Sequence, residues 1–157
     1  MSITVRQDDV RSPDVLALLA QHQAQTSFDL PPESIHSLNA DELRAPNVTF
    51  WVVFDDDVLS GCAAPKELSP GHGEVKSMHT IASARGKGIG RALLAHIVAE
   101  GRNRSYTRLS LETGSSDDFG PAQRLYARHG FAACQPFATY GDDPNSLYMT
   151  LELGSSP

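Results

Sequence analysis

A short stretch rich in glycine and positive charge is the first place where this chain could do chemistry. Residues 85–91 alternate cations with glycines: Arg85, Gly86, Lys87, Gly88, Ile89, Gly90 and Arg91. Glycine lets the backbone approach a ligand closely, and a following helix N-terminus offers N–H donors with partial positive charge. The pattern indicates a loop that holds a pyrophosphate. A tight turn with solvated cations is the alternative, since the spacing matches neither the Rossmann nor the P-loop motif.

Glutamate, histidine and tyrosine side chains can exchange protons, and three of them lie in predicted strands or helices. Glu74 and His79 lie in the alternating segment 72–80, and Tyr126 lies in a predicted helix. Burial raises the pKa of a carboxylate, an imidazole titrates near neutral pH, and a phenol is neutral at pH 7. Each residue also has an ordinary interpretation, as a solvated glutamate, a strand histidine or a buried aromatic. Strand alternation predicts that Glu74 and His79 point to opposite faces.

Elements of both kinds must position these residues. Hydrophobic periodicity and cap signals predict helices at 12–25, 86–103 and 120–130, with a brief helical turn capped by Asn39. Alternation predicts strands at 3–5, within a hairpin at 47–68, and at 72–80, 107–113, 131–137 and 146–153. The expected fold is α/β, with a mixed sheet of about six to seven strands flanked by helices. One domain is expected over 1–153, followed by a short tail at 154–157.

Composition excludes several classes of protein. The net charge of −6 over 157 residues argues against binding dominated by nucleic-acid phosphates or an anionic membrane. No apolar run is long enough to span a bilayer or serve as a signal peptide. The two cysteines, Cys62 and Cys134, are far apart and lack metal-ligand spacing, so we expect free packing thiols, a cytoplasmic location and no metal.

Two motifs in the correct order carry a family resemblance. "EVKSMHTIASARGKGIGRALL" fits a strand, an R/Q-x-x-G-x-G/A loop and a helix, and "FGPAQRLYARHGF" fits a second motif, N-x-x-A-x-x-L-Y-x-x-x-G-F. Together they resemble the GNAT superfamily of acetyl-CoA-dependent N-acetyltransferases. "KEL...HGE.KSM.T" and a tail like "PFA.Y..DPNS..M.L" further resemble a group of small bacterial members. Phe119 stands where the second motif often has Asn.

The resemblance implies roles for particular residues. The loop from Arg85 to Arg91 would bind the pyrophosphate of acetyl-CoA, and Met78, His79 and Thr80 would line its pantetheine arm. Tyr126 would be the general acid beside the sulfur, and Glu74 takes the position that serves as base in some relatives. The base could also be water or His79. Met78 is the nearest candidate for a backbone N–H that stabilises the oxyanion.

The acceptor site is expected in the variable segments 31–43 and 140–149. Ser34, His36, Asn145 and Ser146 could bind a carboxylate, although each also suits a turn. The predicted activity is direct acetyl transfer to a primary amine of a small metabolite or amino acid. The alternatives are an acyl-CoA sensor without turnover and a protein N-acetyltransferase. We expect no nucleic-acid or membrane partner, and a homodimer is possible.

Overall fold

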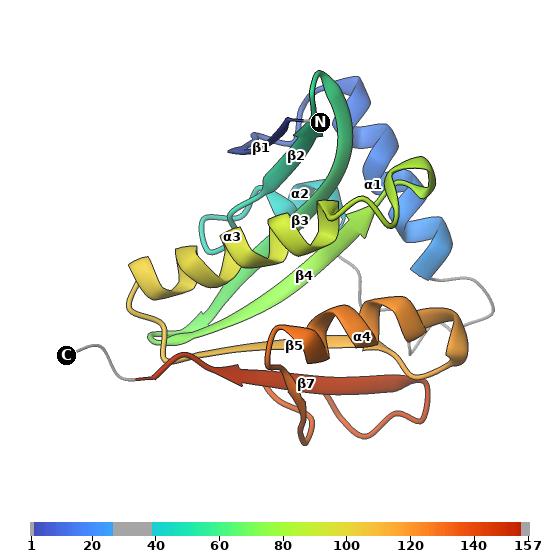
Figure 1. The fold of residues 1–157 in the computed structure, drawn as a ribbon. Coiled ribbons are helices and arrows are strands. Elements are labelled where there is room, and N and C mark those ends of the chain that lie inside the picture. Colours follow the sequence, from blue (N-terminus) through green and yellow to red (C-terminus); the bar gives the residue numbers. More distant parts are fainter. Residues whose placement is uncertain (1, 27–38, 155–157) are drawn as a thin grey trace.

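The computed structural model describes residues 2–26 and 39–154 (Figure 1). Seven strands form one sheet in the order β1-β2-β3-β4-β5-β7-β6. The strands are β1 (Ile3–Gln7), β2 (Trp51–Asp55), β3 (Val58–Ser69), β4 (His72–Thr80), β5 (Arg108–Gly114), β6 (Ala132–Ala133) and β7 (Ser146–Glu152). The helices are α1 (Pro13–Thr26), α2 (Ala40–Leu43), α3 (Ile89–Asn103) and α4 (Gly120–Arg128). The predicted α/β class and mixed sheet are therefore confirmed.

Local signals begin the helices where the sequence indicated. The Ser12 hydroxyl accepts a hydrogen bond from the backbone N–H of Val15 at 3.3 Å, which caps α1. Asn39 and Glu42 form a reciprocal capping box at α2. Gly88 lies outside α3, whose first residue is Ile89, so the glycine stretch is a loop rather than the helix start that the sequence predicted.

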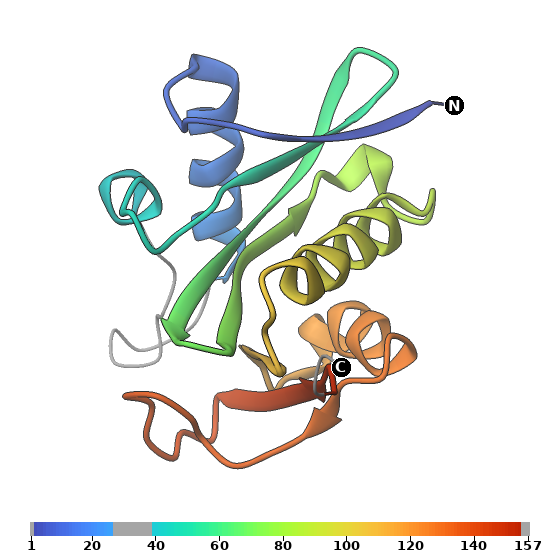
Figure 2. The same cartoon turned by 90° about the vertical axis from the view of Figure 1, so that its left-hand side faces the viewer.

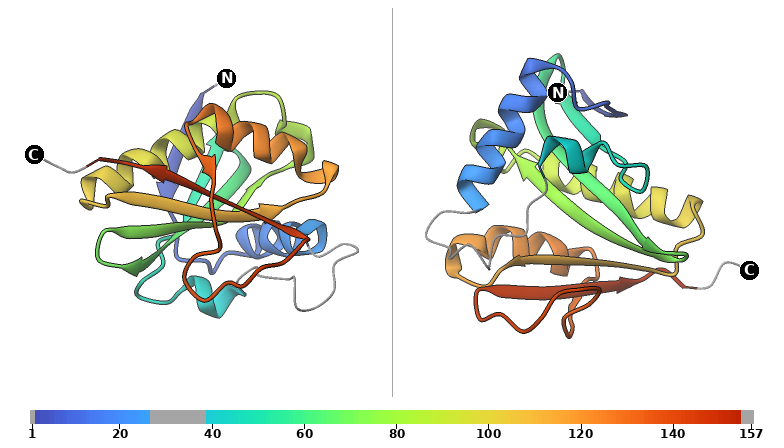
Figure 3. Two further views of the ribbon diagram at one scale, coloured as in Figure 1. Left: turned by 90° about the horizontal axis from the view of Figure 1, so that it is seen from below. Right: turned by 180° about the vertical axis from the view of Figure 1, so that it is seen from behind.

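The helices cover the two faces of the sheet. Figures 2 and 3 show α3 and α4 on one face and α1 and α2 on the other. Each face has its own apolar cluster. The first includes Leu93 and Ile97 of α3 with Leu111 of β5, and the second includes Leu18 of α1 with Cys62 of β3. No helix in the described part of the chain is both long and apolar enough to cross a membrane.

The central strands β4 and β5 are paired over only part of their length. They run parallel, and the register joins residues 72–75 to residues 108–111. β4 nevertheless continues to Thr80 and β5 to Gly114. Figure 1 shows the two strands diverging beyond the paired part. We call residues 72–75 and 108–111 the paired half, and residues 76–80 and 112–114 the diverging half.

A β-bulge lies where the divergence begins. Cys62 of β3 is opposite His79, but Ala64 is opposite Lys76, so three steps along β4 match two along β3. Ser77, inside this interval, has a φ of 54°. An extra residue of this kind leaves the ladder and bends its strand. The backbone of β4 is thus irregular at the point where its pairing with β5 ends.

The bulge corrects the predicted alternation along β4. Val75 and Met78 both pack against the cluster under α3 and α4. His79 instead contacts His22 of α1, on the other face. Because the extra residue reverses the period of two, His79 shares the face of Glu74 rather than opposing it. The sequence-based assignment of these two residues to opposite faces was wrong.

The predicted strand at 131–137 was also too long. β6 spans only two residues, which pair with β7. Pro136 has no backbone N–H for a ladder, which suits its place outside a strand. From Cys134 the chain passes through a turn in which the N–H of Tyr140 donates to the carbonyl of Phe137 at 3.0 Å. Aromatic rings from this segment pack against Tyr148 of β7.

Candidate active site

The glycine loop presents bare backbone at the N-terminus of α3. Gly86 and Gly88 have φ angles of 77° and 84°, which lie in the left-handed region that residues other than glycine disfavour. A Cβ added at either would meet nothing within 4 Å. No side chain of the described residues caps α3. The N–H donors of the first turn therefore have no side-chain cap among the described residues, which suits an anion site.

The other residues of the loop divide into two groups. Ile89 is buried, and a Cβ at Gly90 would lie 3.2 Å from Leu125, so these two positions pack α3 against α4 and β4. Arg85, Lys87 and Arg91 are exposed. The Arg85 guanidinium donates to the Thr80 carbonyl at 3.3 Å and to Gln25 of α1 at 2.9 Å. It thus joins the end of β4 to α1, a contact that the sequence did not reveal.

Tyr126 of α4 lies on the face of the sheet covered by α3. It is 6% exposed, and its ring packs edge-on against Phe131. Burial, with a smaller contribution from the charge of Glu112, raises the pKa of the Tyr126 phenol. The phenol is therefore protonated at neutral pH, the state that a general acid needs.

Phe119, at the position where related motifs often have Asn, has a packing role. A Cβ at Gly114 would lie 2.1 Å from the Phe119 ring, so the ring rests directly on the end of β5. The Gln123 side chain of α4 donates to the Gly114 carbonyl at 2.7 Å. These two contacts fix the start of α4 against the diverging end of β5.

Glu74 belongs to a buried three-residue group on the opposite face. Its Oε2 accepts from the Tyr140 hydroxyl at 2.6 Å and pairs with the Lys76 Nζ at 3.2 Å. Lys76 Nζ also donates to the Tyr140 oxygen at 2.7 Å. The Glu74 and Lys76 side chains are only 4% and 9% exposed. Charges so deeply buried are retained only when they are paired and hydrogen-bonded, as they are here.

More polar side chains continue this face beside Glu74. His72 Nε2 lies 2.7 Å from the Ser110 hydroxyl, which lies 3.1 Å from that of Thr150. Desolvation, then the charge of Arg108, lowers the pKa of His72. His72 therefore contacts Ser110 through one ring nitrogen and Arg108 through the other.

His79 forms a second buried group with His22. The two rings are 5.1 Å apart in an edge contact, and the His79 Nε2 lies 3.5 Å from Gln21 Oε1. Burial lowers the pKa of each to about 4, assisted by the neighbouring charge of His79 at His22 and of Arg85 at His79. Both are neutral at pH 7. His22 is 7% exposed and His79 is 6% exposed, so both rings lie in the interior.

Two of the four residues suggested for the acceptor site lie in the described structure. The backbone N–H of Asn145 donates to Asp143 Oδ1 at 2.9 Å in a tight turn, and Ser146 begins β7 opposite Gly114. Along β7, Ser146 lies four residues, or roughly 13 Å, from Thr150, the residue that contacts Ser110 in the polar group beside Glu74. Ser34 and His36 lie outside the described residues. An acceptor role for these four residues stays a prediction.

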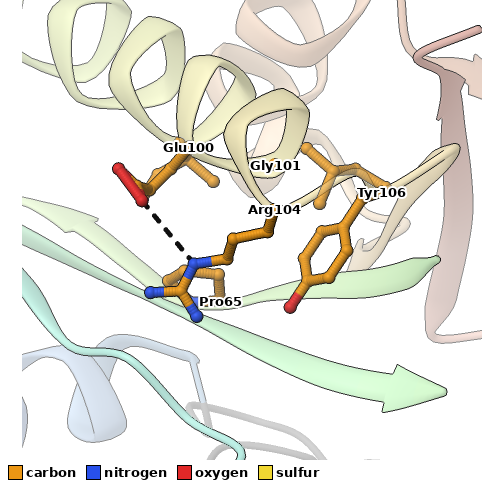
Figure 4. A pocket seen from close by; sticks show the side chains of 7 residues that line it. Pro65, Glu100, Gly101, Arg104 and Tyr106 are labelled. Atoms are coloured by element: carbon orange, nitrogen blue, oxygen red, sulfur yellow. Dashed lines mark ion pairs between the residues drawn. The ribbon is translucent and has the colours of Figure 1, made fainter. Parts of the chain in front are cut away.

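A small pocket lies at the far end of α3 from the glycine loop (Figure 4). Its lining includes Pro65, Tyr106 and the ion pair between Glu100 and Arg104, whose charged atoms are 3.6 Å apart. None of its residues belongs to the predicted site. It borders the paired half through Leu109, away from the diverging strands.

The residues that could take part in a reaction therefore lie on both faces of the sheet, near the point where β4 leaves β5. On the α3 and α4 face are the uncapped glycine loop and the protonated Tyr126 phenol. On the opposite face are Glu74, Lys76 and Tyr140. A reactant held where β4 leaves β5 would have an anion site and an acid on one side and a carboxylate on the other. This arrangement suits transfer of a group between two molecules that approach from opposite faces.

Known proteins are similar in sequence to this chain. The sequence profile of the acetyltransferase (GNAT) family matches residues 16–131. The chain is 48% identical over 149 residues to the uncharacterized N-acetyltransferase YsnE of Bacillus subtilis (strain 168), covering 95% of this chain and 99% of the relative. It is 35% identical over 153 residues to an IAA acetyltransferase of Azospirillum brasilense, covering 97% and 99%.

Solved structures share the fold. A structure from Klebsiella pneumoniae subsp. pneumoniae MGH 78578, assigned to the acyl-CoA N-acyltransferases, has a TM-score of 0.78 at 29% identity, covering 96% of this chain and 97% of that one. The yncA structure from Salmonella typhimurium, solved with its cofactor acetyl-CoA, has a TM-score of 0.72 at 18% identity, covering 100% and 97%. At 18% identity, the likeness to the Salmonella structure shows a shared fold only.

Proposed function

Because the chain belongs to the GNAT acetyltransferase family, we propose that it uses acetyl-CoA and moves the acetyl group directly to a primary amine of a small metabolite or amino acid. The observation that carries the proposal is the divergence of β4 from β5 beside an uncapped helix whose loop has two left-handed glycines. An acyl donor with a phosphate-bearing carrier fits that combination. The similarity of fold to a structure that contains acetyl-CoA supports the choice.

In this proposal the diphosphate of the cofactor binds at residues 85–91. The first-turn N–H groups of α3 donate to it, and Lys87 and Arg91 supply charge from the exposed side. Arg85 uses two of its five N–H groups on Thr80 and Gln25, and the others can donate to a phosphate oxygen. The edge of β4 at Met78, His79 and Thr80 lacks the pairing with β5, so its backbone can hydrogen-bond the pantetheine amides.

Acetyl-CoA supplies a thioester, and this chain's residues supply the proton transfers. Tyr126 donates the proton that the departing sulfur needs, and its raised pKa keeps that proton available at neutral pH. The backbone N–H of Met78, beside the bulge, is the candidate donor to the oxyanion. Glu74 takes a proton from the acceptor on the other face.

The acceptor class is the least constrained part of the proposal. Asn145 and Ser146, with Ser34 and His36, are proposed to bind a carboxylate carried by the amine. The Azospirillum relative is named for IAA, so IAA belongs in any screen of acceptors. A cytoplasmic location, expected from the two free cysteines, remains part of the proposal.

A thiol-release assay tests the function. The purified chain is incubated with acetyl-CoA and, in turn, free amino acids, their methyl esters, polyamines, lysine peptides and IAA. We expect thiol release that depends on one class of free amine, with esters reacting more slowly than the parent amino acids. Esters that react equally well would remove the carboxylate-recognition idea.

The same assay separates the alternatives. Acetyl-CoA binding by calorimetry without thiol release for any acceptor would favour a sensor. Release only with lysine peptides would favour a protein N-acetyltransferase. Absence of acetyl-CoA binding would overturn the proposed function as a whole.

A further inference from the structure

Glu74 is enclosed in a way that affects how it can act as a base. It is 3% exposed, and one of its two carboxylate oxygens, Oε2, is held by Lys76 and Tyr140. Tyr140 comes from the segment between β6 and β7, 66 residues away in sequence, and its side chain is only partly buried. Tyr140 therefore covers the Oε2 side of Glu74 and is the more exposed of the two residues.

The three contacts fix the direction of the Tyr140 proton. A lysine ammonium can only donate, so the 2.7 Å contact from Lys76 makes the phenol oxygen an acceptor. The single hydroxyl proton of Tyr140 is then donated to Glu74 Oε2 at 2.6 Å. This bond is short and charge-assisted, and it points the Tyr140 proton at the carboxylate. Lys76 thus polarises the phenol and orients it at the same time.

We propose that Tyr140 is a proton-relay residue through which the acceptor amine is deprotonated by Glu74. This inference rests on the proposed function and identifies how its base is reached. The acceptor ammonium gives one proton to the Tyr140 oxygen while the Tyr140 hydroxyl proton moves to Glu74 Oε2. The neutral amine then attacks the thioester carbon, and the carbon–sulfur bond breaks.

The remaining protons balance. The thiolate takes the proton of Tyr126, and the acetylated nitrogen loses its surplus proton, which restores Tyr126 by way of solvent. Glu74 returns its proton through Tyr140 to water. The net release is one proton for each acetylated ammonium. The raised pKa of Tyr140, caused by burial and then by the charge of Glu74, agrees with a phenol that passes protons without remaining ionised.

Phe137 and Tyr148 keep the relay in place without taking part in it. Their rings pack against Tyr140 with centroids 5.2 Å and 5.5 Å away. The Tyr148 hydroxyl donates to the Gly141 carbonyl at 2.9 Å rather than to Glu74. Tyr148→Phe is therefore a matched control, because it removes a hydroxyl from the same aromatic group and leaves the carboxylate untouched.

The test compares Tyr140→Phe with wild type on two primary amines of similar size. At about pH 7.5, the amino group of alanine is an ammonium, whereas that of 3,3,3-trifluoroalanine is largely neutral and needs no base before attack, and both amines keep the carboxylate. We expect kcat/KM for alanine to fall about 100-fold in Tyr140→Phe, and for the fluorinated amine to change less than about 3-fold. Glu74→Gln should give the same pattern, and the double variant should lose little more.

Each outcome decides the proposal. Tyr148→Phe should stay within about 2-fold of wild type with both amines, and circular dichroism should show that all variants are folded. Equal losses with both amines, or a Tyr140→Phe rate equal to that of Tyr148→Phe, would overturn the relay alone. If wild type acetylates no amine, the proposed function fails and the relay fails with it. If Glu74→Gln does not fold because Lys76 is left unpaired, Tyr140→Phe alone decides the relay.

Discussion

The two halves of the β4 and β5 pair are built differently. In the paired half, a Cβ at Gly73 would lie 2.7 Å from the Tyr106 ring, and Leu109 is completely buried. In the diverging half, Ser77 has a positive φ and β4 has no β5 partner. The glycine loop that follows β4 has open space around Gly86 and Gly88.

The difference separates stability from proposed function within the same two strands. Close packing and regular pairing stabilise the paired half, where there is little room for a larger side chain. In the second half, backbone groups of β4 have no β5 partner, which is costly unless water, a ligand or another polar group pairs with them. We therefore expect substitutions of apolar residues in the paired half to change the free energy of unfolding, and substitutions at Glu74 or around the diverging half to change binding or turnover.

The largest expected effect is on turnover. Tyr126→Phe should lower kcat by about 10²–10⁴-fold with little change in KM for acetyl-CoA, because only the proton for the leaving sulfur is lost. Steady-state kinetics with the best acceptor of the screen measures it. The melting temperature should stay near that of wild type, since the ring still packs against Phe131. Undiminished turnover would leave Tyr126 a core aromatic.

The paired half should show the opposite behaviour. Leu109→Ala removes a side chain that is 0% exposed and should lower the free energy of unfolding by about 2–5 kcal/mol. Urea unfolding measures the loss, and calorimetry should find unchanged acetyl-CoA affinity in the folded protein. Val58→Ala is the control, because Val58 is 59% exposed and its truncation should cost little. A large loss of affinity in Leu109→Ala would break the separation of the two halves.

Acidification should destabilise the protein through the diverging half. The pKa values of His22 and His79 are about 4 in the folded protein, below the ordinary value of 6.5. The unfolded chain thus binds more protons between those values, so stability is highest above about pH 6.5 and falls as the pH drops toward about 4. The slope is about 1.4 kcal/mol per pH unit for each histidine.

Urea unfolding from about pH 7 to about pH 5 measures this dependence. His79→Gln should reduce the slope by about 1.4 kcal/mol per pH unit, the contribution of one proton. This change distinguishes the histidine pair from His72 in the paired half, because burial also lowers the pKa of His72. A slope that does not change in His79→Gln would show that the pair does not control the acid response.

The smallest expected effect concerns the glycine loop. Gly88→Val should weaken acetyl-CoA binding about 10–100-fold, because a side chain there obstructs charge-assisted hydrogen bonds from the first turn of α3. Calorimetry measures the affinity. Gly71→Val is the matched control: Gly71 has a φ of 86°, so the backbone strain is similar, but it lies in the turn between β3 and β4. Equal affinities in the two variants would remove the loop from the site.

The sequence alone determined the local features of this protein. Hydrophobic periodicity and caps located the helices, and the glycine pattern located a bare loop next to α3. These features depend on residues within a few positions of one another, so their spacing contains the information. The register of the second motif likewise identified Tyr126, although its burial and its raised pKa appear only in the structure.

Only the tertiary structure decided which residues meet. The bulge at Ser77 placed Glu74 and His79 on one face, because an added residue reverses strand alternation and no local sequence pattern marked it. Tyr140 reaches Glu74 across 66 positions because the segment after β6 leaves the sheet instead of extending it. Contacts of this kind arise from the path of the whole chain. The sequence therefore indicated the loop and a candidate acid, and the fold revealed how the carboxylate is enclosed.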